Sequence, residues 1–353
     1  MDNFVSKNYM NKTGIIITLA YPETIVRVSS EWSSSHVYLL GIGKKNYVRA
    51  GHAALVLIEK ASGNLEYFDF GRYVTPQPTG RVRSKLTDHE LDVPLQAELQ
   101  GNTVINLDDI LKFLATHPKL THGEGTMLAS VCGDIDFDKA KNYINNLQTV
   151  GLIHYAAFGK KGSNCARFVT DTLIACVANK AIKKKLKKSK WFTPSTIGNV
   201  LIADTQQNIY EVSETGTIGT FKSSKFRENR KLFLDPLKHH QPNHEGNIEP
   251  KTNPIHHEKA QWLSGIGGGA WFELHCLGHN SEYRFKRISP YGNIDVDGVY
   301  KISGSGFDSN RDYEFVPYSN CSFIHVKQHG KTFRFDFLRK NELINSAQRE
   351  HSI

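Results

Sequence analysis

A cysteine at the start of a predicted helix is the most informative feature of the sequence. Residues 161–169 read Lys-Gly-Ser-Asn-Cys-Ala-Arg-Phe-Val. Because Ser163 is a typical N-cap, we predict a helix from Asn164 to about Lys188, with Cys165 in its first turn. The positive end of a helix lowers a thiol pKa, and its unpaired N–H groups suit an oxyanion. The pattern therefore predicts a nucleophilic Cys165, with a buried structural cysteine as the alternative.

A thiol nucleophile needs a base, and a histidine at the start of an apolar run can serve. His52 follows Gly51 and opens the run His-Ala-Ala-Leu-Val-Leu-Ile. Imidazole titrates near neutral pH, so it can accept the thiol proton and return it to a leaving group. We predict His52 as this base, and the alternative is a hydrogen-bonded histidine at a strand end.

A third group is expected to orient the imidazole. The run that begins at His52 and the run 65–70 flank a Gly/Asn turn, which predicts a β-hairpin. If the turn centres on its Ser-Gly pair, Asp69 is the only carboxylate on the histidine face. We therefore predict Asp69. A slip of one residue would favour Glu66 or Arg72. Tyr73 is the next candidate on the Asp69 face.

These motifs resemble the circularly permuted NlpC/P60 group of papain-like proteins, which includes the lecithin retinol acyltransferase-like enzymes. The resemblance covers about residues 45–200 and is carried by the Gly-His strand, its hairpin partner and the later Asn-Cys-x-x-Phe-Val segment. The histidine precedes the cysteine, as in the permuted group, and Thr193-Pro194 after the cysteine helix is similar too. The segment 67–73 resembles uncharacterised members of Bacteroidetes type. The acyltransferase branch has a second histidine where this chain has Asn64.

The resemblance implies an α+β fold: a permuted papain-like domain with an antiparallel sheet and a cysteine-bearing helix. It also implies a cysteine hydrolase that acts by acyl transfer, without a cofactor. The first hypothesis is cleavage of an amide bond in a peptide or a peptidoglycan fragment. The second is a lipid acyltransferase or lipase, and the third is a binding module that keeps the fold without catalysis.

Two groups of basic residues are candidates for binding. Arg72, Arg81 and Arg83 follow the hairpin and could clamp a carboxylate or phosphate of the substrate, with a solvated loop as the alternative. The run Lys183–Lys190 is expected to be a solvated helix end. If it binds a partner, an anionic membrane surface or nucleic acid is the candidate.

Composition narrows the class of protein. The chain has 353 residues, of which 39% are hydrophobic and 22% are charged, an ordinary composition for a globular protein. Its net charge of +9 does not by itself indicate nucleic acid, so we do not expect nucleic acid as a partner. The apolar run 15–20 is too short to span a bilayer, and we expect no signal peptide. Five widely spaced cysteines form neither a disulfide framework nor a zinc site, so we expect a cytoplasmic protein with reduced thiols and no metal.

The pattern of apolar runs and of the polar, proline-containing segment between them predicts two domains. We assign 1–235 to the papain-like domain and 236–260, with four prolines and five histidines, to a linker. Recurrent short strand signals at 261–340 predict a small all-β accessory domain, and 341–353 form a polar tail.

Overall fold

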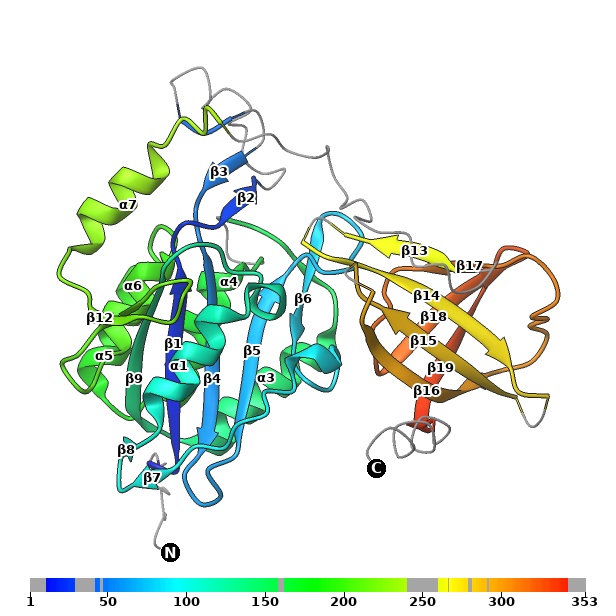
Figure 1. Cartoon of the computed structure of the whole chain (residues 1–353), viewed down its shortest axis with the longest axis horizontal. Helices are drawn as coiled ribbons and strands as arrows, with labels where there is room; N and C mark the ends of the chain where they lie inside the picture. The colour runs from blue at the N-terminus through cyan, green and yellow to red at the C-terminus, as the bar shows by residue number, and fades with distance from the viewer. Residues whose placement is uncertain are drawn as a thin grey trace, which may run out of the picture. The chain divides into compact units, whose positions relative to one another are not determined.

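The structure is a computed structural model that describes residues 11–28, 42–44, 47–157, 162–239, 260–265, 267–278, 281–290 and 292–341. It divides into two compact units (Figure 1). The first contains Met1–Gly71, Arg81–Ser84 and Leu91–His240, and the second contains Arg72–Gly80, Lys85–Glu90 and Gln241–Ile353. Two short segments that precede the cysteine thus group with the C-terminal part of the chain, which the sequence did not predict.

An eight-stranded sheet with the order β10-β6-β5-β4-β1-β9-β11-β12 forms the centre of the first unit. The pairs β5–β4, β4–β1 and β1–β9 are antiparallel. All eight residues of β1 and seven of eight in β4 are buried, so both faces of the central strands are covered. The strands are β1 (Gly14–Tyr21), β4 (His52–Glu59), β5 (Leu65–Gly71), β6 (Thr79–Arg83), β9 (Met127–Ile135), β10 (Ile153–His154), β11 (Tyr210–Val212) and β12 (Ile218–Thr220).

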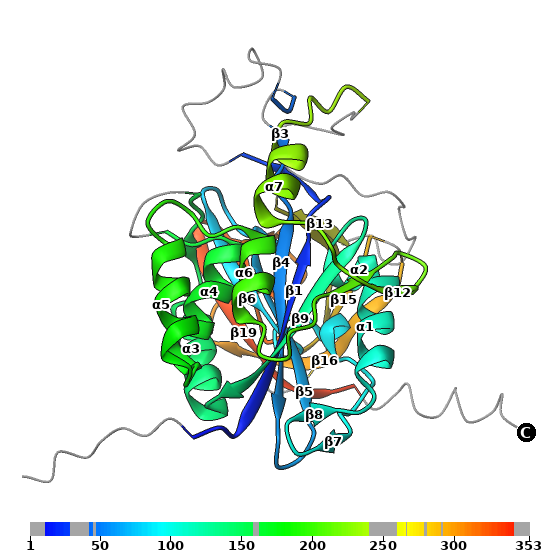
Figure 2. The same ribbon diagram turned by 90° about the vertical axis from the view of Figure 1, so that its left-hand side faces the viewer.

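Helices cover the two faces of this sheet (Figure 2). Side chains alternate along β1, so Ile15 and Ile17 pack in the core with α1, whereas Ile16 packs in the core with α3 and α4. This explains the continuous apolar run of β1, because each face meets its own helical layer. The helices are α1 (Leu107–Thr116), α2 (Pro118–Thr121), α3 (Phe137–Val150), α4 (Cys165–Cys176), α5 (Lys180–Ser189), α6 (Thr196–Ala203) and α7 (Lys225–Phe233). Two small ribbons, β2 (Ile25–Arg27) with β3 (Tyr47–Arg49) and β7 (Leu99–Gln100) with β8 (Thr103–Val104), complete the unit.

The long helix expected from Asn164 to Lys188 is wrong, because the chain breaks it into α4 and α5. Val177 pairs with Ile135 at the end of β9, and the Ala178 N–H donates to Asp134 O at 2.8 Å. These bonds hold the backbone in an extended form after α4. Asn179 then caps the new helix by accepting from the first-turn N–H groups of α5.

The second unit is an antiparallel sheet of seven strands with the order β13-β14-β15-β16-β19-β18-β17. Its first and last strands, β13 and β17, are in contact, so the sheet is a nearly closed, barrel-like structure. Aromatic side chains such as Phe272, Phe285 and Phe335 fill its core. The strands are β13 (Gln261–Ser264), β14 (Gly269–Cys276), β15 (Glu282–Ile288), β16 (Ile294–Ser303), β17 (Glu314–Val316), β18 (Phe323–Gln328) and β19 (Lys331–Lys340).

Segment Lys85–Glu90 is built into this second unit. The Cys321 N–H donates to Thr87 O at 2.9 Å, and buried Arg287 pairs with Asp88 at 3.0 Å. Of the expected linker, residues 236–239 and 260 fall within the described part of the chain, and the expected tail beyond 341 lies outside it. In the described part of the chain, no helix has the length and apolarity needed to cross a membrane.

Candidate functional site

Cys165 is the first residue of α4, as the sequence predicts, but the residue that caps this helix is Asn164 rather than Ser163. The Asn164 side chain accepts a hydrogen bond from the Arg167 N–H at 2.9 Å and donates one to Ala156 O at 2.9 Å. Both bonds fix where the helix begins. The thiol therefore sits at the positive end of the helix, beside first-turn N–H groups that have no partner within the helix.

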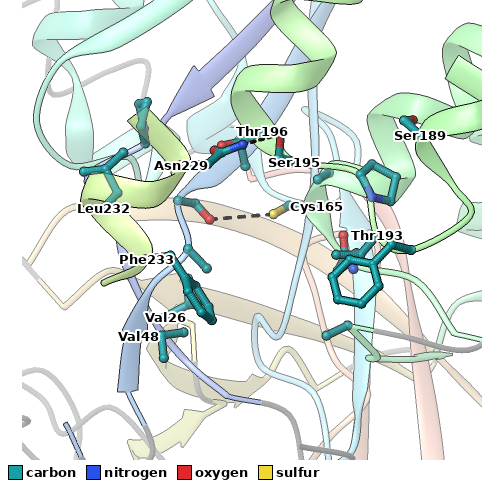
Figure 3. A pocket seen from close by; sticks show the side chains of 18 of the residues that line it. Val26, Val48, Cys165, Ser189, Thr193, Ser195, Thr196, Asn229, Leu232 and Phe233 are labelled. Atoms are coloured by element: carbon teal, nitrogen blue, oxygen red, sulfur yellow. Dashed lines mark hydrogen bonds between the residues drawn. The ribbon is translucent and has the colours of Figure 1, made fainter. Parts of the chain in front are cut away.

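His52 is the first residue of β4, the strand on which α4 packs. It lies opposite Tyr21 of β1, and the two rings stack with centroids 6.4 Å apart. The preceding Gly51 has φ +76°, and a Cβ there would meet Thr196 Oγ1 at 2.9 Å. Glycine is therefore needed for the tight entry into β4. Its carbonyl oxygen lies 4.0 Å from Cys165 Sγ, which brings the start of β4 to the start of α4 (Figure 3).

The imidazole of His52 connects the thiol to a buried carboxylate. Its Nε2 lies 3.2 Å from Asp69 Oδ2, and Cys165 lies close enough to raise the pKa of the ring. Burial lowers the pKa of His52, but the hydrogen bond to Asp69, the charge of that carboxylate and the nearby Cys165 outweigh burial and raise the pKa to about 9. The ring therefore favours its cationic form beside the thiol.

Asp69 is completely buried and held from several sides. Arg83 donates from Nε to Oδ1 at 2.9 Å and from Nη2 to Oδ2 at 2.5 Å, and the Tyr67 hydroxyl donates to Oδ2 at 3.2 Å. Burial raises the pKa of Asp69, but the Arg83 charge and the hydrogen bonds from His52 and Arg83 hold it well below its usual range. The carboxylate thus stays ionised and can favour the imidazolium form of His52.

The other candidates for the third position lie elsewhere. Glu66 faces away from the histidine and binds Lys141 Nζ at 2.6 Å. Tyr73 belongs to the second unit, where it forms an isolated bridge with Gly268. Among the residues weighed from the sequence, the structure brings Asp69 to His52.

The three arginines expected at the substrate cleft do not meet there. Arg83 is bound to Asp69, and Arg81 is buried opposite Gly71 in the β5–β6 pair. Arg72 is a buried residue of the second unit. None of the three lines the pocket that contains Cys165.

That pocket lies within the first unit and has a volume of about 850 Å³. Figure 3 shows Cys165 on one wall, facing Val26, Val48 and Phe233 across the cavity. Among the described residues, five cationic side chains and no aspartate or glutamate line it: Arg27, Arg49, Lys185, Lys188 and Lys225. Most of the remaining lining is apolar or aromatic: Pro22, Val26, Val28, Val48, Ala50, Tyr155, Ala157, Ala166, Trp191, Phe192, Pro194, Ile202, Leu232 and Phe233.

This pocket suits a ligand with an apolar body and a negative group. Sequence reasoning missed Trp191 and Phe192, although an aromatic pair directly after a lysine run was a visible signal. It also missed Arg83 as the partner of Asp69, a contact visible only in three dimensions. Among the described residues, no group of three or more His, Cys, Asp or Glu side chains is arranged to hold a metal ion.

Comparison with known proteins gives partial matches. Residues 16–182, which include His52, Asp69 and Cys165, match the family model described as type VI secretion system effector TseH-like. Residues 260–338 match the model of the DUF6695 C-terminal domain. A crystal structure of the type VI secretion system effector TseH is 17% identical, with a TM-score of 0.40, and the match covers 60% of this chain and 100% of that one. No curated protein matches the chain. Over residues 16–182, the chain is thus similar to TseH-like effectors of type VI secretion systems.

Proposed function

We propose that the first unit is a cysteine hydrolase of the permuted papain-like type. The observation that carries the proposal is the placement of Cys165 at the wall of a pocket, with its Sγ 4.0 Å from Gly51 O, next to His52, whose Nε2 lies 3.2 Å from Asp69 Oδ2. A nucleophile, a base and a group that orients the base, within hydrogen-bond reach of one another, are the arrangement that thiol hydrolases need. The match to TseH-like effectors supports a hydrolase that a secretion system delivers to its target.

In the proposed reaction, His52 accepts the thiol proton and Cys165 Sγ attacks the carbonyl carbon of the substrate. Since Nε2 of His52 faces Asp69, Nδ1 is the nitrogen left for the thiol. When the tetrahedral intermediate collapses, the bond to the leaving group breaks and the imidazolium donates its proton to that group. Water, deprotonated by His52, then hydrolyses the thioester and releases the acid.

The negative oxygen of the intermediate needs donors that are already in place. The N–H groups of Cys165 and Ala166 lie in the first turn of α4, where helix geometry supplies no internal acceptor. They are therefore the proposed oxyanion donors. The Arg83–Asp69 pair keeps the carboxylate ionised and so maintains the imidazolium.

The first candidate substrate is an amide bond in a peptide or a peptidoglycan fragment. A second candidate, an ester of a lipid, is favoured by the apolar lining of the pocket. Both would use the same acyl-enzyme chemistry, so the leaving group distinguishes them. An acyl group with an apolar body suits the cavity in either case.

A matched pair of probes tests the proposal. Octanoyl p-nitroanilide and p-nitrophenyl octanoate carry the same acyl chain on an amide and an ester. We expect turnover of at least one, with an octanoyl adduct on Cys165 detected by mass spectrometry, and loss of both turnover and adduct in Cys165→Ser. Cys176→Ser is the control, because Cys176 is buried in the core and away from the pocket. Turnover that survives Cys165→Ser would contradict the proposal, and inertness of both probes would favour the binding module.

A further inference from the structure

Two of the most exposed aromatic side chains in the described part of the chain follow α5 directly. Trp191 is 87% exposed and Phe192 is 73% exposed. Adjacent exposed apolar side chains mark interaction sites more often than singly scattered ones. Together with the exposed Lys180, Lys184, Lys187 and Lys188 they form what is called here the α5 surface.

The α5 surface is strongly cationic. Helix α5 reads Lys-Ala-Ile-Lys-Lys-Lys-Leu-Lys-Lys-Ser and contains no acidic residue. Ile182 and Leu186 are buried and hold the helix against the first unit, so the lysines face outward. Just beyond the helix, Lys190 pairs with Asp171 at 2.6 Å. The arrangement is that of an amphipathic helix with lysines on its polar face and aromatic residues at its end.

We propose that the α5 surface docks on an anionic lipid bilayer. Tryptophan and phenylalanine side chains are stabilised at the boundary between headgroups and acyl chains, because the ring leaves water there. Lysines near the bilayer are attracted by anionic headgroups, and their contributions accumulate with number. The α5 surface provides both within one helix and the two aromatic residues that follow it.

The pocket of Cys165 connects with this surface. Lys185, Lys188, Trp191 and Phe192 line the pocket, and the other lining residues are mainly apolar. A docked molecule therefore holds the mouth of the pocket at the membrane, where an acyl chain can enter. Single-stranded nucleic acid also binds lysines interleaved with aromatic rings. The adjoining apolar cavity favours lipid, because an acyl chain can bind in it and a charged nucleic acid backbone cannot.

The test measures binding of the full chain to vesicles, by flotation and by tryptophan fluorescence. We expect binding to phosphatidylcholine vesicles with 30% phosphatidylglycerol, and little binding to pure phosphatidylcholine or to a 20-nucleotide oligo(dT). Trp191→Ala/Phe192→Ala should weaken vesicle binding about tenfold or more, and Lys184→Glu/Lys187→Glu should do the same and reduce the salt dependence. Binding by Cys165→Ser should equal that of the natural chain, because docking does not depend on the proposed thiol chemistry.

Matched controls distinguish binding through the α5 surface from nonspecific binding to vesicles. Ile105→Ala/Val150→Ala removes two exposed apolar side chains, and Lys112→Glu/Lys119→Glu reverses two exposed charges, both elsewhere on the first unit. Neither should change binding by more than about twofold. Equal loss in the controls, absence of binding to anionic vesicles, or stronger binding to oligo(dT) than to vesicles would overturn the proposal.

Discussion

Arg83 and Asp69 form a buried bidentate ion pair, with Nε of Arg83 2.9 Å from Oδ1 and Nη2 2.5 Å from Oδ2 of Asp69. Both side chains are almost fully excluded from water. The carboxylate that faces His52 is therefore stabilised by an arginine on its other side. An aspartate buried without such a partner would favour its neutral form and would hold the imidazolium less strongly.

Removal of Arg83 should destabilise the first unit strongly. Arg83→Met leaves Asp69 buried without its main partner, so we expect a loss of about 3–5 kcal/mol in the free energy of unfolding. Urea titration measures it. Lys141→Met is the matched control, because the Lys141–Glu66 pair is partly exposed and should contribute less than about 1 kcal/mol. Equal losses in the two variants would contradict the special role of the buried pair.

The thiol of Cys165 should react faster than the core thiols. At pH 6–7, iodoacetamide should label Cys165 well before Cys132 or Cys176, because burial raises the pKa of both core thiols, to about 12 for Cys132. His52→Ala should slow labelling of Cys165 markedly, since the imidazolium partner is lost. Asp69→Asn should slow it less. Peptide-resolved mass spectrometry of the quenched reaction gives the rates.

If the three proteins label Cys165 with the same pH profile, centred near the free-thiol value of about 8.5, then Cys165 is an ordinary cysteine. The binding-module hypothesis would then replace the hydrolase. A shift with His52→Ala alone would keep the thiol–imidazole pair and remove Asp69 from its role.

The stability of the first unit should fall in a defined alkaline range. The pKa of His52 is raised from 6.5 to about 9, so the folded state holds the imidazolium proton more tightly than the unfolded state. Its contribution, on the order of 3 kcal/mol, is complete below pH 6.5 and is lost as the pH rises through about 9. His52→Ala should flatten the unfolding free energy over this range. An unchanged slope would show that His52 is not the titrating group.

The cap of α4 should matter for reactivity as well as for stability. Asn164→Ala removes the side-chain acceptor for the Arg167 N–H, and we expect a loss of about 0.5–2 kcal/mol and slower alkylation of Cys165. Asn179→Ala removes the equivalent cap of α5 and should cost a similar free energy without slowing alkylation. If both variants slow alkylation equally, the effect comes from the lower stability of the first unit rather than from the position of the thiol.

Limited proteolysis should cut first within 236–260, where four prolines and few apolar residues predict an exposed linker. The fragments should nevertheless remain together under native conditions. Segment Lys85–Glu90 is bonded inside the second unit through Thr87 and Asp88, so a cut in the linker does not free that unit. Size-exclusion chromatography followed by denaturing electrophoresis checks this. A first cut within 100–200 would contradict the predicted linker.

The sequence alone placed the parts of the site that depend on local rules. A Gly-His pair at the start of an apolar run predicts a histidine at a strand end, and a Ser-Asn-Cys start of a helical pattern predicts a cysteine in a first turn. The expected hairpin turn predicts Asp69 on the face of His52, because side chains alternate along a strand, and the observed β4–β5 register excludes the slip of one residue. These inferences need only neighbouring residues.

Only the tertiary structure decided the rest, because the deciding contacts join residues far apart in the chain. The helix break after Cys176 depends on bonds from Val177 and Ala178 to the end of β9. Arg83 binds Asp69 rather than a substrate because β6 pairs with β5 in a register that no local pattern states. The pocket requires β2, β3, α4, α5 and α7 to meet, so its apolar and cationic lining exists only once the chain is folded.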